Sequence, residues 1–153
     1  GNYPSAYNHL QQALTAAKQY DPEQYKTSIY LLFSLVLDKL NQPQKSDRIF
    51  QKAVLSIAEV PPPRQTECYY FMAKRQLHNS DANAQKSISL GDQISTNRGM
   101  WGWSLKLKAL LAGSELSTQQ DHEQYQNLLK KLCKDMPPEQ QSLLEDHLLP
   151  QKR

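Results

Sequence analysis

The stretch that decides the fold is residues 46–53, SDRIFQKA, in which a small, a large apolar and a small residue follow one another at spacings of four and three. They are Ser46, Phe50 and Ala53. Residues three and four apart lie on the same face of a helix. Small side chains on that face allow a neighbouring helix to approach, and the large side chain fills the space between them. The stretch therefore predicts a helix that packs against another helix.

The same pattern occurs twice more, about forty residues before and after the first. The members of these copies are Ala6, Leu10 and Ala13, and then Ala84, Ile88 and Gly91. Such a period is typical of stacked helix pairs, in which each pair buries its apolar face only against its neighbours. We therefore predict a helical-repeat scaffold, which is suited to binding more than to catalysis.

Helical periodicity continues through most of the 153 residues, and no segment alternates with the period of two that predicts a strand. We predict one all-α domain of seven or eight antiparallel helices over residues 1–153. The expected units cover about 1–21, 22–60, 63–95 and 98–135, followed by a capping helix over 138–149. Because the first residue is not Met, we expect the chain to be a piece of a larger polypeptide.

A family resemblance is carried by residues in roughly the first 95 positions. In the first unit these residues are Gly1, Tyr3, Pro4, Ala6, Leu10, Ala13, Asp21 and Pro22. In the second they are Tyr30, Phe33, Ser34, Leu37, Asn41, Ser46, Phe50 and Ala53. The third unit is weaker, with Cys68, Phe71, Asn79, Ala84, Ile88 and Gly91. The pattern resembles the tetratricopeptide repeat, although the period here is about 38 to 40 residues in place of 34 and Met72 stands where the family has a small residue.

The resemblance implies helix pairs stacked as a right-handed superhelix, with the first helix of each pair lining a concave, peptide-binding surface. Longer units of this kind resemble the helical-repeat sensor domains of large bacterial signalling proteins. We therefore expect a protein–protein interaction scaffold within a cytoplasmic, regulatory polypeptide. We expect neither enzymatic activity nor a cofactor.

The candidate groove residues lie on the expected first helices, outside the main apolar stripes. They are Lys39, Tyr69, Lys74, Arg75 and Lys106. Positive charge along one surface would favour an acidic peptide or a C-terminal carboxylate as the partner. The competing interpretation is that the cations are ordinary solvated side chains and that the tyrosine packs between helices.

Recognisable catalytic and metal-binding motifs are absent from the sequence. The four histidines are scattered, and there is no His-x-x-x-His, Cys-x-x-Cys, Gly-x-Ser-x-Gly or glycine-rich phosphate loop. Cys68 and Cys133 lie in apolar helical settings, which predicts buried, free thiols. A disulfide between them stays open as the alternative.

Composition bears on whether the chain binds a membrane, a nucleic acid or a second copy of itself. No apolar run is long enough to span a bilayer, so we expect no membrane partner. The net charge is +3. Most nucleic-acid-binding proteins concentrate more positive charge than this on one face, so nucleic acid is a disfavoured partner. The first alternative to peptide binding is self-association, in which an apolar face pairs two copies into a homodimer. A nucleic-acid-binding helical array and a small helical enzyme are less favoured.

Overall fold

The computed structural model describes residues 2–20, 22–134, 136, 137, 139, 140, 144 and 148. In this part of the chain the secondary structure consists of seven α-helices and one 3-10 turn, without strands. The elements are α1 (Tyr3–Tyr20), α2 (Pro22–Lys39), α3 (Pro43–Ser56), η1 (Ile57–Glu59), α4 (Pro62–His78), α5 (Ala84–Asn97), α6 (Trp101–Ala112) and α7 (Gln119–Leu132). The predicted all-α class is confirmed. The capping helix expected over 138–149 lies largely outside the described residues.

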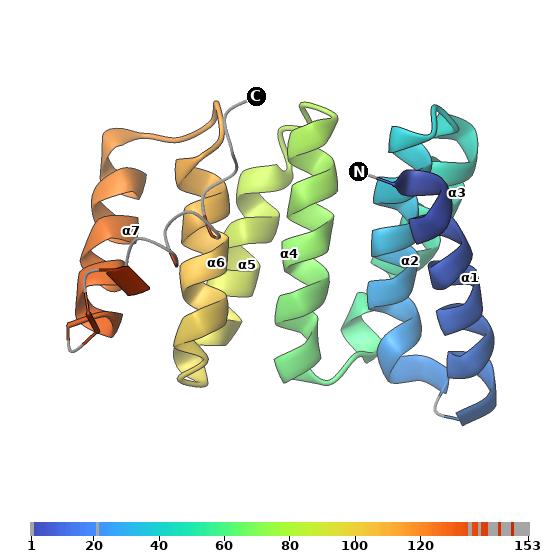
Figure 1. Ribbon diagram of the computed structural model, residues 1–153, viewed down its shortest axis with the longest axis horizontal. Coiled ribbons are helices and arrows are strands. Elements are labelled where there is room, and N and C mark those ends of the chain that lie inside the picture. Colours follow the sequence, from blue (N-terminus) through green and yellow to red (C-terminus); the bar gives the residue numbers. More distant parts are fainter. Residues whose placement is uncertain are drawn as a thin grey trace.

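The helices stand side by side along the longest axis of the molecule, with α1 and α3 near one end and α7 at the other (Figure 1). Three of them, α2, α4 and α6, contact one another in succession. The remaining helices pack onto this row: α1 and α3 onto α2, α5 onto α4 and α6, and α7 onto α6. Each helix therefore contacts mainly its near neighbours, as expected for a stack of helix pairs.

Two helices of the row end in the same kind of turn. Asn41 after α2 and Ser80 after α4 both adopt the left-handed conformation, with φ of 56° and 54°. In each turn the next amide donates to the carbonyl five residues earlier, at 2.9 and 2.8 Å, which is the hydrogen bond of a Schellman cap. Lys39 and His78 consequently occupy equivalent positions, each two residues before the left-handed residue.

The apolar core consists of three clusters spaced along the stack. The first joins α2, α3, η1 and α4 through Leu31, Phe50, Ala53, Ile57, Val60, Cys68 and Met72. The second joins α4, α5 and α6 through Ala73, Ile88, Leu107 and Leu110. The third joins α6 and α7 through Leu105, Ala109, Ala112, Tyr125, Leu129 and Cys133. Apolar surface is thus buried between neighbouring helices, as the repeat predicted.

Two copies of the small–large–small pattern lie at helix contacts. All their members, Ser46, Phe50, Ala53, Ala84, Ile88 and Gly91, are buried. Gly91 shows how close the approach is. A Cβ atom added there would lie 3.0 Å from both Cβ of Tyr69 and Cδ1 of Leu107. A larger residue there would require Tyr69 or Leu107 to shift, so the glycine favours the close packing of α5 against α4 and α6.

The first copy of the pattern behaves differently. Ala6 and Leu10 are half-buried, and Ala13 is exposed, so the expectation that Ala13 is buried is wrong. The reason is that α1 stands at the end of the row, where α2 is the one described helix against which it packs broadly. The remaining faces of α1 carry exposed polar side chains, among them Gln11 and Gln12.

Cys68 and Cys133 are both buried and neither is part of a disulfide, as predicted. Burial raises the pKa of Cys68 from 9.0 to about 12. Because the thiolate is the reactive form of Cys68 and because Cys133 is buried from the reagent, we expect both thiols to react slowly with a thiol reagent in the native protein at pH 8, and rapidly in denaturant. Mass spectrometry after timed alkylation measures this. Fast labelling of native Cys68 would contradict its burial.

The free energy of unfolding should also fall as the pH rises above 9, because the Cys68 thiol then loses its proton in the unfolded chain but retains it in the folded chain.

Candidate functional site

A hollow of about 450 Å³ lies where the C-terminal ends of α2, α4 and α6 meet the loop that follows α6. We call it the α2–α4–α6 groove. Its apolar lining consists of Leu35, Leu77, Leu110 and Leu116. Its polar lining consists of Lys39, Lys74, His78, Ser80, Ser114 and Glu115, with Gly113 beside them. The groove therefore combines an apolar lining with two ammonium groups, one imidazole and one carboxylate.

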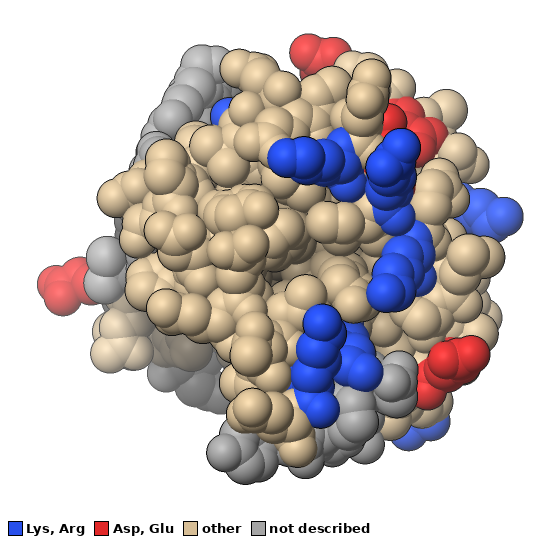
Figure 2. Space-filling view, turned by 90° about the vertical axis from the view of Figure 1, so that its right-hand side faces the viewer, with Lys and Arg blue, Asp and Glu red and all other residues tan. Residues whose placement is uncertain are grey.

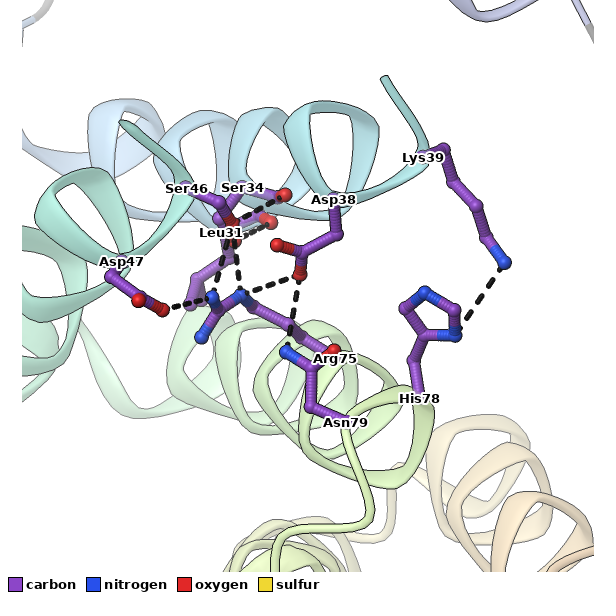
Figure 3. Close-up of polar contacts among 9 residues, drawn as sticks. All are labelled: Leu31, Ser34, Asp38, Lys39, Ser46, Asp47, Arg75, His78 and Asn79. Atoms are coloured by element: carbon purple, nitrogen blue, oxygen red, sulfur yellow. Dashed lines mark hydrogen bonds and ion pairs between the residues drawn. The ribbon is translucent and has the colours of Figure 1, made fainter. Parts of the chain in front are cut away.

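The two lysines are available to an anionic group. Lys39 and Lys74 are both exposed, and no carboxylate of the described residues forms an ion pair with either. The Lys39 ammonium Nζ lies 3.5 Å from Nδ1 of His78, and the two side chains point toward each other across α2 and α4 (Figure 3). The Lys74 ammonium lies 5.9 Å from the ring centroid of Tyr70. A carboxylate of a partner could accept hydrogen bonds from either ammonium.

Arg75 was predicted to line the groove, but it is buried between helices, with 5% of its surface exposed. Its Nε lies 2.9 Å from Oδ2 of Asp38 on α2, and its Nη2 lies 2.6 Å from Oδ1 of Asp47 on α3 (Figure 3). The same guanidinium donates to the hydroxyl of Ser46 at 3.0 and 3.2 Å and stacks on the ring of Phe50 at 4.2 Å. Arg75 thus joins α4 to α2 and α3 and does not reach the groove.

The other two candidates also lie elsewhere. Tyr69 is half-buried and packs against the first core cluster, and its Cβ lies 3.0 Å from the position that a Cβ at Gly91 would take. Lys106 is exposed, with its ammonium 4.5 Å from the ring centroid of Trp103, in a separate shallow hollow on α6. Of the five candidates, the structure therefore places Lys39 and Lys74 in the α2–α4–α6 groove, and Tyr69, Arg75 and Lys106 lie outside it.

Sequence reasoning missed His78 as a groove residue. Its signal was the repeat itself: Lys39 and His78 are 39 positions apart, which is one period. Residues one period apart take equivalent positions on neighbouring first helices. A comparison of first-helix C-termini at that offset would have found the pair.

A second polar cluster connects α5, α6 and α7. The ammonium of Lys108 lies 2.8 Å from Oδ2 of Asp92 and 3.3 Å from Oε1 of Gln124, and Ser104 donates its hydroxyl to Asp92. The side chain of Ser104 is buried between these helices. These contacts link three helices through two half-buried charges, which is a packing role. Across the residues that the structure describes, no group of three or more His, Cys, Asp or Glu side chains is placed to hold a metal ion.

Comparison of the chain with protein-family models, with curated proteins and with solved structures finds no match. Among the residues that the structure describes, none of the helices has the length and apolar character needed to cross a bilayer.

Proposed function

We propose that this chain is a tetratricopeptide-like interaction scaffold that binds an acidic peptide segment with an apolar anchor residue in the α2–α4–α6 groove. The observation that carries the proposal is the placement of Lys39 and Lys74, without carboxylate partners among the described residues, on the rim of a leucine-lined hollow. Carboxylates recognise ammonium groups, and an aliphatic or aromatic side chain fills such a hollow.

The stacked architecture supports a scaffold role. Three apolar core clusters pack successive helices against one another. Arg75 of α4 adds ion pairs with α2 and α3. A surface formed by such rigid neighbours needs little ordering when a peptide binds, so little of the interaction energy is lost to entropy. In this proposal the helix pairs form a right-handed superhelix with α2, α4 and α6 on its concave side. The parent polypeptide is cytoplasmic and regulatory, and the domain has no enzymatic activity.

The groove sets the chemistry of the peptide. A volume of about 450 Å³ accommodates one or two large side chains with the backbone that carries them. The lysines lie at its rim, so acidic groups are expected beside the anchor and not at its centre. The carboxylates can come from Asp and Glu side chains or from the peptide's C-terminus, since both present the same group.

Reversing both charges should weaken peptide binding by about tenfold or more, equivalent to about 1.4 kcal/mol. We expect this for the double substitution Lys39→Glu and Lys74→Glu, tested with fluorescent peptides selected from a random library on the unaltered protein. Because both lysines are exposed, the free energy of unfolding should change little. Fluorescence anisotropy at increasing salt measures the binding, which should weaken as salt rises.

The matched control reverses two exposed lysines outside the groove, Lys86→Glu on α5 and Lys130→Glu on α7, which keeps the same net charge. This variant should bind as the unaltered protein does. Peptides with free and amidated C-termini distinguish the two sources of carboxylate. If the selected peptides are basic, or if the control variant loses as much affinity as the groove variant, the proposal is wrong.

A further inference from the structure

The outer face of α3 carries a short seam of exposed side chains. Lys45, Arg48, Lys52 and Leu55 follow one another at spacings of three, four and three, and all four are exposed. Leu55 has 81% of its surface exposed. At 1.5 Å per residue the seam is about 15 Å long. We call these four residues the α3 seam.

Positive charge on this end of the molecule is not balanced by acidic side chains. Figure 2 shows lysine and arginine gathered along an arc there, with the acidic residues toward the margins. The one carboxylate of α3 belongs to Asp47, which is paired with Arg75 of α4 at 2.6 Å. Within the described residues, no ion pair engages Lys45, Arg48 or Lys52. The seam therefore presents three uncompensated cations.

This arrangement disfavours the isolated helix. Like charges three and four residues apart on a helix repel one another, and here two such pairs follow in succession. Lys52 also lies over the ring of Tyr30, at 4.9 Å from Nζ to the centroid, which holds its stem against α2. The repulsion between these cations destabilises α3, and Leu55 beside them is almost fully exposed. Both features are expected where a partner supplies carboxylates to the cations and an apolar side chain to the leucine.

We propose that the α3 seam docks an acidic, amphipathic helix of another protein, independently of the α2–α4–α6 groove. Spacings of three, four and three are those with which one helix meets a second helix along a heptad. Carboxylates on the partner pair with the three cations, and an apolar residue of the partner covers Leu55. The occupant is thus defined by charge complementarity and by the apolar end of the seam.

Two other polyanions fit less well. Single-stranded nucleic acid is bound by cations together with aromatic side chains on which bases stack, and the seam contains no aromatic residue. An anionic membrane surface is bound by helices with a broad apolar face, and the seam offers one leucine. A partner helix is the class that uses both the cations and Leu55.

The test is a titration of ¹⁵N-labelled protein with a synthetic three-heptad helix. The probe carries Glu at the positions that face the cations and Leu at the position that faces Leu55, and a second probe has Gln in place of Glu. We expect saturable shifts of the amides of α3 with the Glu probe and none of that size at the groove. Binding should weaken with salt. The Gln probe should bind about tenfold more weakly or not at all.

Variants separate the two components of the seam. The double substitution Arg48→Glu and Lys52→Glu should weaken binding by about tenfold or more, and Leu55→Ser by several fold. The matched control is the double substitution Lys86→Glu on α5 and Lys130→Glu on α7, which makes the same change in net charge at exposed lysines of other helices and should have no effect. All variants should stay folded, because the changed side chains are exposed.

Several results would overturn the inference. The first is that the shifts of the α3 amides do not saturate with the Glu probe. The second is that the Glu and Gln probes bind equally. The third is that an RNA oligonucleotide or phosphatidylserine vesicles bind more tightly than the Glu probe. Sedimentation at several protein concentrations tests whether a second copy of this chain binds the α3 seam. Self-association abolished by the Arg48→Glu and Lys52→Glu substitution would assign the seam to a second copy of this chain and contradict a foreign partner.

Discussion

Replacing Arg75 by Ala should lower the free energy of unfolding by about 3–5 kcal/mol, the largest effect expected for a single substitution in this chain. The guanidinium is buried, and the Asp38 side chain that faces it is only 7% exposed. Without Arg75, the Asp38 carboxylate keeps its burial and the hydrogen bond from Asn79 at 3.2 Å, but loses its counter-ion. An uncompensated buried charge is the main source of the loss. Urea denaturation, followed by circular dichroism, measures it.

Two further variants identify the cause. Asp47→Asn removes the other carboxylate, whose side chain is 67% exposed, and should cost less than about 1 kcal/mol. The pair Arg75→Met with Asp38→Leu removes both buried charges and should recover much of the stability lost in Arg75→Ala. If Arg75→Ala changed the free energy of unfolding by less than 1 kcal/mol, roughly the value of an exposed pair, the contact would be hydrated and the inferred burial would be wrong.

The error over Arg75 shows which part of the site could not be predicted. Lys74 and Arg75 are adjacent, and successive helical residues point about 100° apart, so only one of them could face the groove. The sequence does not say which, because the deciding partners are Asp38 and Asp47, on other helices. Lys74 is the one of the two that lines the α2–α4–α6 groove. Local periodicity shows that the side chains of Lys74 and Arg75 point to different faces of α4. The ion pairs of Arg75 with other helices decide which of the two faces is buried.

The fold was more predictable because helical periodicity is a local property. The pattern around Ala53 and Ala84 correctly predicted buried helix contacts. The same pattern failed at Ala13, because burial there depends on whether another helix covers α1. Which helices stand at the ends of a stack is not encoded in any one repeat.

Ala53→Leu should destabilise the protein by about 1–3 kcal/mol, whereas Ala13→Leu should change the free energy of unfolding by no more than about 0.5 kcal/mol. Ala53 is fully buried in the first core cluster, so a longer side chain there must displace its neighbours. Ala13 occupies the equivalent repeat position on α1 but is exposed.

The comparison isolates helix stacking from local preference, since Leu and Ala have similar helix propensities and the substitution is the same at both sites. Chemical denaturation of the two variants beside the unaltered protein measures the difference. Equal losses at both positions would mean that α1 is covered as α3 is, and a tolerated Ala53→Leu would mean that the inferred register of α3 is wrong. A loss confined to Ala53 would show that the small residue is required by the neighbouring helix and not by its own, which is the physical basis of the stack.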